Sequence, residues 1–198
     1  MSRRHATLFL VLLLIVGCSP RVPVAPAALR GQDPHATAPG DWRGRGRIEI
    51  HGFNQRFSAG CLVRGTLSTA RAVFLSDEGL VLADLELGPA GLTVHRLVPA
   101  LRPRVETLAG LIAPYVRLDE TQRGWRRGVL RAATAQDVRR YGGDPLLLRR
   151  IDGRGWPLTV GDYVPVAGGL VPRLVTAHGP LGVGLRLRLV EVGPLTPP

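Results

Sequence analysis

Short runs in which apolar and polar residues alternate occupy most of the chain after residue 42. A period of two residues puts alternate side chains on opposite faces of a β-strand, so each run predicts a strand with one apolar face. Glycine, proline and acidic turn residues separate the runs, which predicts chain reversals and an antiparallel sheet. The expected strands cover residues 47–51, 55–63, 70–75, 80–87, 92–97, 128–133, 146–151, 158–165, 170–178 and 182–192.

Two segments in mid-chain predict helices instead. Over residues 103–116 the apolar residues recur every three or four positions, with Pro103 in the expected first turn and Pro114 near the end. A shorter helix is predicted over 135–141, because Thr134 can cap its start and two glycines follow it. The predicted fold class is therefore mainly β with inserted helices, an α+β arrangement.

The first eighteen residues resemble the export signal of a bacterial lipoprotein. Arg3 and Arg4 precede an apolar run that is shorter than the roughly 20 residues of a membrane-spanning helix. The run ends in Leu14-Ile15-Val16-Gly17-Cys18, which resembles a lipobox. That resemblance implies that residues 1–17 are a signal peptide and that Cys18 carries palmitate-like acyl chains that anchor the mature protein to a membrane. An ordinary secretory signal that contains a cysteine is the alternative.

The residues after the cysteine bear on location and domain organisation. In Gram-negative lipoproteins an aspartate after the cysteine usually signals inner-membrane retention, so Ser19 favours the periplasmic face of the outer membrane by analogy. Residues 18–41 are rich in proline and alanine, which predicts an extended linker. A single domain is expected over 42–193, followed by a tail over 194–198, and the protein is expected to be a monomer.

The net charge of +11 raises the possibility of a nucleic-acid partner. All 26 basic residues are arginine, however, which indicates a coding bias rather than a selected binding face. Arginine also alternates with leucine over 185–189, as on the solvent face of a strand. We therefore expect no nucleic-acid partner, and a weak attraction to anionic lipid headgroups instead.

Motifs for catalysis are missing from the sequence. The chain has no lysine, no Gly-x-Ser-x-Gly elbow and no His-x-x-x-His spacing, so we predict no catalytic residue, no metal site and no cofactor. With Cys18 acylated, Cys61 has no disulfide partner and is expected to be a buried structural thiol. The chain is therefore expected to be non-enzymatic, with an envelope hydrolase as the enzymatic alternative.

Five segments resemble the LolA/LolB-like family of periplasmic carriers and outer-membrane lipoproteins. The segments are 42–50, 75–82, 108–115, 171–175 and 185–192, and they repeat the family's order of strands, helix and strands on a chain with a lipobox. The resemblance implies a curved antiparallel half-barrel sheet lidded by helices, which shelters lipoprotein acyl chains. The turn after Leu75 is short and acidic, unlike the leucine-bearing loop of the outer-membrane acceptor. This departure favours a relative with the same fold and another cargo.

The expected function is therefore an outer-membrane lipoprotein that binds a lipid or an acylated protein in an apolar half-barrel cavity, in lipoprotein or lipid transport. A structural or assembly lipoprotein with a filled core and no ligand is the alternative, since each residue of the proposed lining could equally be plain core. The proposed lining is Phe57, Val81, Ala83, Leu85, Leu87, Leu185, Leu187 and Leu189 from the strands, with Leu108, Leu111 and Ile112 from the lid.

The lipid anchor is testable through the substitution Cys18→Ser. Removal of the sulfur that accepts the lipid should leave the signal uncleaved by the lipoprotein peptidase and abolish incorporation of radiolabelled palmitate. The matched control is Cys61→Ser, which should leave labelling unchanged. Labelling that survives Cys18→Ser would contradict the lipobox interpretation.

Overall fold

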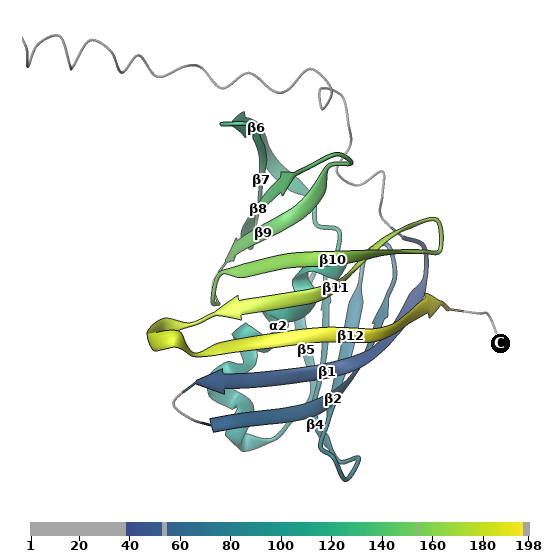
Figure 1. The fold of residues 1–198 in the computed structure, drawn as a ribbon, viewed down its shortest axis with the longest axis vertical. Helices are drawn as coiled ribbons and strands as arrows, with labels where there is room; N and C mark the ends of the chain where they lie inside the picture. The colour runs from purple at the N-terminus through teal and green to yellow at the C-terminus, as the bar shows by residue number, and fades with distance from the viewer. Residues whose placement is uncertain (1–38, 53–54, 154, 196–198) are drawn as a thin grey trace, which may run out of the picture.

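A computed structural model describes residues 39–195 of the chain, apart from 53–54 and 154. In this part of the chain twelve antiparallel strands form one sheet, in the order β5-β4-β3-β2-β1-β12-β11-β10-β9-β8-β7-β6. The sheet is open and curls around a helical segment (Figure 1). The strands are β1 Trp42–Gly52, β2 Gln55–Gly65, β3 Ala70–Leu75, β4 Val81–Gly88, β5 Gly91–Leu97, β6 Glu120–Arg126, β7 Val129–Thr134, β8 Asp137–Gly142, β9 Leu147–Gly153, β10 Leu158–Val166, β11 Gly169–His178 and β12 Gly184–Pro194.

The centre of the sheet joins the two ends of the domain. The first strand, β1, pairs with the last strand, β12, while the other neighbouring strands follow one another along the chain. The register places Ile48 opposite Leu187, and both side chains are buried on the inner face. Alternation in the sequence therefore becomes an apolar concave face and a polar convex face, as the period of two predicts.

The helical segment lies on the concave face. It consists of the 3₁₀ turn η2 Pro99–Arg104, the α-helix α2 Val105–Ile112 and the 3₁₀ turn η3 Ala113–Tyr115. Helix α2 contacts β3, β4 and β11. The helix predicted over 103–116 is thus confirmed, although its α-helical part is shorter, because Pro103 and Pro114 lie in the flanking 3₁₀ turns.

The second predicted helix, over 135–141, is wrong: these residues form the β7–β8 turn and strand β8. Thr134 does accept hydrogen bonds from the backbone N–H groups of Gln136 and Asp137, at 3.1 and 3.0 Å. A threonine hydroxyl can satisfy such amides at a helix start or in a tight turn, so this signal does not separate the two structures. Here pairing of β8 with β7 and β9 decides in favour of the strand.

Strand β6 was not expected from the sequence. Its side chains are mostly exposed on both faces, and it forms one edge of the sheet beside β7. A strand without a buried face shows no apolar alternation, which is why the pattern gave no sign of it.

The predicted signal peptide, Cys18 and most of the predicted linker lie outside the described residues. Backbone hydrogen bonds hold the two ends of the described chain against the domain. The N–H of Gly40 donates to the carbonyl of Ala167 at 3.1 Å, and the N–H of Leu195 donates to the carbonyl of Asp41 at 3.0 Å. Within 39–195, apart from the gaps named above, no helix has the length and apolar character needed to cross a membrane.

Packing between α2 and the sheet predicts the effect of Leu111→Ala. Leu111 is fully buried in the core cluster, so its truncation removes burial and leaves a cavity, at a cost of about 2–5 kcal/mol in the free energy of unfolding. Urea denaturation measures this loss. The control Leu92→Ala, at a half-exposed site on edge strand β5, should cost much less. A loss below about 1 kcal/mol at Leu111 would contradict the packed interface.

Candidate ligand-binding site

A cavity of about 410 Å³ lies beside α2, between the β4–β5 turn on one side and strands β8 to β10 on the other. Helix α2 contributes Glu106, Ala109 and Gly110, and Ala113 follows at its end. Their spacing of three, four and seven places them on one face of the helix. The complete lining is Leu87, Gly91, Leu92, Glu106, Ala109, Gly110, Ala113, Ala135, Gln136, Asp137, Ile151, Gly153, Gly155, Trp156 and Leu158.

Small residues on this helix face explain why the space stays open. A Cβ atom added at Gly110 would lie 3.6 Å from the nearest Leu158 methyl, an ordinary contact distance, so the helix and β10 lie close at this point. On either side, Ala109 and Ala113 project only a methyl group. The opposite face of α2 carries Leu108, Leu111 and Ile112, which fill the core. The helix therefore packs tightly on one side and loosely on the other.

One end of the cavity is covered by the β9–β10 loop. The backbone at Gly155 lies directly on the first turn of α2, since a Cβ there would be 3.3 Å from the Glu106 carbonyl oxygen. Trp156 is held between Gly179, where a Cβ would come within 2.6 Å of the indole, and Arg104, whose guanidinium lies 5.4 Å from the ring centroid. This packing fixes the indole at the wall of the cavity.

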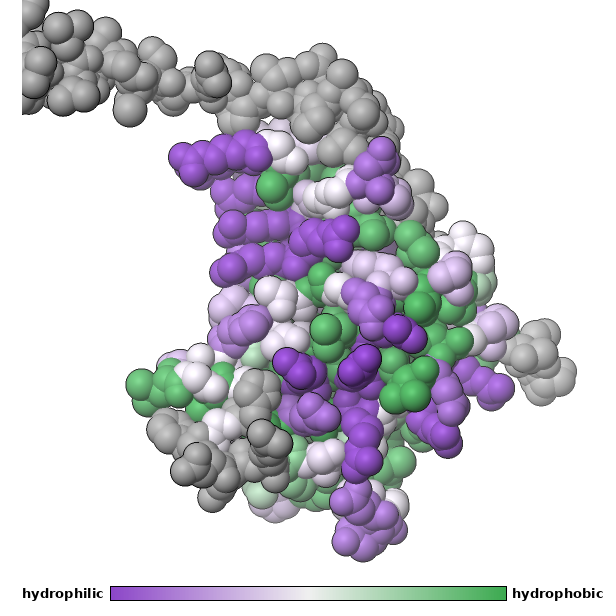
Figure 2. Space-filling view, in the orientation of Figure 1, coloured by the Kyte–Doolittle hydropathy of each residue, from purple (hydrophilic) through white to green (hydrophobic). Residues whose placement is uncertain are grey.

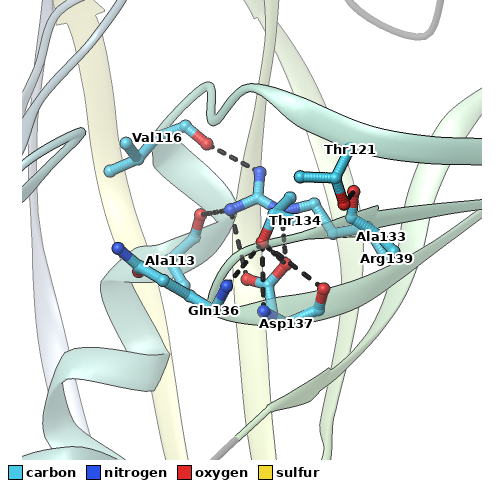
Figure 3. Close-up of polar contacts among 8 residues, drawn as sticks. All are labelled: Ala113, Val116, Thr121, Ala133, Thr134, Gln136, Asp137 and Arg139. Carbon is cyan, nitrogen blue, oxygen red and sulfur yellow. Dashed lines mark hydrogen bonds and ion pairs between the residues drawn. The ribbon is translucent and has the colours of Figure 1, made fainter.

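The other end of the helical segment is held by a buried arginine from β8 (Figure 3). Arg139 is 2% exposed and donates from Nη1 to the Val116 carbonyl at 2.7 Å and from Nη2 to the Ala113 carbonyl at 3.2 Å. Carbonyls at a helix C-terminus lack partners within the helix, and a cation there also interacts favourably with the helix dipole. Arg139 therefore fastens the end of the helical segment to the sheet.

The charge of Arg139 is balanced inside the protein by Asp137. Its Nε donates to Asp137 Oδ1 at 3.1 Å, and both side chains are almost fully buried. Asp137 Oδ1 also accepts from the Thr134 hydroxyl at 3.0 Å (Figure 3). The β7–β8 turn thus positions the carboxylate that accompanies the buried guanidinium. The sequence signal was present in the Asp-x-Arg spacing, which puts both side chains on one face only if the segment is a strand.

Comparisons with known proteins bear on the fold. No protein-family model matches the chain, and no curated protein matches it by sequence. Among solved structures, a LolA superfamily protein from Nitrosomonas europaea superposes with a TM-score of 0.54 at 9% identity, covering 87% of this chain and 94% of that chain. The chain has a LolA/LolB-like fold.

Two further solved structures match this chain with lower TM-scores. A putative outer membrane lipoprotein-sorting protein domain from Vibrio parahaemolyticus has a TM-score of 0.49 at 9% identity, covering 77% of this chain and 84% of that chain. A DUF1329 family protein from Desulfovibrio piger has a TM-score of 0.47 at 11% identity, covering 80% of this chain and 87% of that chain. The curled antiparallel sheet expected from the sequence is the common element with the LolA-like fold.

Most of the residues proposed as a lining lie inside the core of the LolA-like sheet. Phe57 is 46% exposed on β2, near the β1–β2 turn, and Val81 is half-buried at the start of β4. Leu87 belongs to the core and also lines the 410 Å³ cavity. The buried members of the set, which join one cluster, are Ala83, Leu85, Leu87, Leu108, Leu111, Ile112, Leu185, Leu187 and Leu189.

A smaller cavity, of about 80 Å³, lies near Trp42 at the start of β1. Tyr115, Tyr141 and Tyr163 line it. Arg139 lines it as well, while its partner Asp137 lines the larger cavity. Burial raises the pKa of the Tyr115 hydroxyl well above its ordinary value, so this group stays neutral.

Cys61 is buried as predicted, and burial raises the pKa of its thiol, which disfavours the reactive thiolate. The thiol of Cys61 is therefore a poor nucleophile. Within the part of the chain that the structure describes, no three His, Cys, Asp or Glu side chains gather to form a metal site.

Arg139→Met tests the fastening of the helix end. The variant leaves Asp137 buried without its cation and removes a donor from the carbonyls of Val116 and Ala113, so the free energy of unfolding should fall by about 3–5 kcal/mol. Amide hydrogen exchange over 109–116 should accelerate more than exchange over β1 and β12. The control is Arg140→Met on the outer face of the same strand, where a half-exposed ion pair with Asp152 contributes at most about 1 kcal/mol. Equal losses for the two variants would contradict the assignment.

Proposed function

We propose that the protein is a non-enzymatic envelope lipoprotein that binds a lipid or a lipoprotein acyl chain in the cavity beside α2. The observation that carries the proposal is the 410 Å³ space between the small-residue face of α2 and the LolA-like sheet. Ligand pockets commonly measure about 300–1,000 Å³ and are mostly apolar with a few polar groups. The cavity has the size and composition of such a pocket.

The chemistry of the wall favours a chain-like apolar ligand. Leu87, Ile151 and Leu158 supply aliphatic surface, and each methylene of a ligand that leaves water contributes about 0.8 kcal/mol. Two polar side chains also line the wall: Glu106, on the first turn of α2, is exposed, and Gln136, in the β7–β8 turn, is half-buried. An acyl chain would therefore lie along the aliphatic wall with its polar end beside one of these two residues.

The helical segment would serve as the lid. Arg139 holds one end through the Ala113 and Val116 carbonyls, and a proline-containing 3₁₀ turn leads into the other end. Release of those two carbonyls, together with exposure of the apolar α2 side chains that pack in the core, would let α2 move away from the sheet. The core residues proposed from the sequence, Leu108 and Leu111 among them, would then extend the cavity for a longer chain.

The anchor and the location of the protein belong to the same proposal and rest on the sequence. Acylation at Cys18 would hold the mature chain on the periplasmic face of the outer membrane. A proline-rich linker over residues 18–41 would span up to about 70 Å at roughly 3.1 Å per residue. The domain could then collect or deliver a lipid at some distance from its own anchor, as a monomer.

A structural lipoprotein without a ligand is the second candidate. The packing of nine of the proposed lining residues into one buried cluster favours it, because a filled core offers a ligand no space in the closed arrangement. The two candidates differ in whether the 410 Å³ cavity is occupied.

Substitution of Ala109 by leucine separates the two candidates. The larger side chain fills space that two or three ligand methylenes would occupy, so at about 0.8 kcal/mol each the affinity for cis-parinaric acid should fall roughly 15- to 60-fold. Fluorescence titration measures the affinity, and thermal unfolding should show unchanged or higher stability. The control Ala90→Leu adds the same side chain at an exposed turn and should leave the affinity unchanged.

The carrier proposal fails if the unsubstituted protein does not bind the fatty acid, or if Ala109→Leu and Ala90→Leu bind it equally well. Native mass spectrometry of the protein purified from membranes is an independent check. A co-purified lipid supports the carrier, whereas protein repeatedly free of lipid favours the structural candidate.

A further inference from the structure

The convex face of β12, β1 and β2 is strongly basic. Its described side chains include six arginines but only two glutamates, Glu49 and Glu191. Strands β1 and β12 lie towards the viewer in Figure 1, and Figure 2 shows hydrophilic side chains gathered over this part of the molecule with apolar ones among them. The six arginines, all exposed, are Arg43, Arg45, Arg47, Arg64, Arg186 and Arg188; with Arg71 on β3 we call them the arginine face.

The register brings several of these arginines together. Arg47 lies directly opposite Arg188, and Arg64 lies between Arg43 on one side and Arg71 on the other. Like charges directly opposite one another destabilise a sheet. This arrangement lowers the stability of the sheet. Opposite charges at the same positions would stabilise it, so the arginines bring no structural benefit here.

Acidic neighbours offset part of the charge only. Arg45 pairs with Glu191 at 2.9 Å, Arg47 with Asp77 at 3.3 Å and Arg71 with Asp84 at 2.7 Å. Among the described residues, Arg43, Arg64, Arg186 and Arg188 take part in no ion pair with an acidic side chain. These four guanidinium groups are therefore available to an external anion.

A bulge makes a shallow pocket in the middle of the arginine face. The register of β1 with β12 shifts between Arg45 and Gly46, which leaves Val190 unpaired. A depression of about 410 Å³ lies there, lined by Arg45, by Arg47 with its partner Asp77, and by Leu62 and Val190, which are 44% and 65% exposed. A β-bulge redirects side chains locally, and here it presents aliphatic groups to solvent between cations. The surface thus combines positive charge with exposed apolar groups.

We propose that the arginine face docks on an anionic lipid bilayer. Guanidinium groups bind phosphate oxygens bidentately, which matches the headgroups of such a surface. Leu62 and Val190 would reach the apolar boundary below the headgroups. The face begins at Arg43, directly after the segment that is expected to lead to the anchor. Since the cavity beside α2 opens on the opposite face of the sheet, docking would leave it accessible.

Vesicle co-sedimentation tests the proposal with the chain from residue 18 onward carrying Cys18→Ser, which lacks only the expected signal peptide and the acylated sulfur. The vesicles contain either phosphatidylcholine alone or phosphatidylcholine and phosphatidylglycerol in equal parts. The triple variant Arg43→Gln, Arg64→Gln and Arg188→Gln should bind anionic vesicles about 100-fold more weakly, equivalent to about 1 kcal/mol for each arginine. Thermal unfolding should be unchanged or improved, because like charges are removed.

The matched control removes the same charge elsewhere: Arg96→Gln, Arg102→Gln and Arg126→Gln, all exposed on β5, η2 and β6. It should retain binding within a few-fold. Comparable losses in the two triple variants, or no binding of the unsubstituted chain to anionic vesicles, would overturn the proposal. Binding to an acidic protein surface without binding to vesicles would overturn it as well. Fatty-acid affinity is measured on the same variants, so that failure of membrane docking can be told apart from failure of the proposed cargo function.

Discussion

A curled sheet of twelve strands has one apolar face that must leave water, and the segment 99–115 is the helical element that lies on that face. Its larger side chains, Leu108, Leu111 and Ile112, enter the core and contribute most of the burial. Its smaller ones, at 109, 110 and 113, face the candidate cavity between α2 and the sheet. Among the described residues one short α-helix cannot fill so wide a sheet, so the same burial that stabilises the fold leaves the candidate cavity.

The buried pair of Arg139 and Asp137 fixes the end of the helical segment on the sheet. Breaking such a pair is costly because an unpaired charge remains in the interior, yet the pair itself contributes little net stability compared with apolar packing. A contact of this kind specifies one arrangement of the helix end. It acts through two carbonyl contacts, at Ala113 and Val116, beside the apolar packing of α2 in the core.

Much of this architecture could be predicted from the sequence, and the failures have identifiable causes. Alternation located most strands and put Leu185, Leu187 and Leu189 on the inner face, but it could not tell a cavity wall from a packed core, since that depends on which helix face meets them. Thr134 falsely indicates a helix cap because turns and caps use the same hydroxyl hydrogen bonds. The all-arginine composition suggested coding bias, whereas strand register, invisible in the sequence, placed Arg47 beside Arg188.

In the proposed carrier, an apolar chain occupies the space between α2 and the sheet. Methyl NMR with a fatty acid carrying a nitroxide at its chain end tests this most directly, because the spin label broadens only nearby signals. We predict broadening of the Ala109, Ile151 and Leu158 methyl signals, with those of Val94 and Val190 unaffected. Broadening confined to exposed methyl groups, or absent throughout at saturating fatty acid, would contradict the claim.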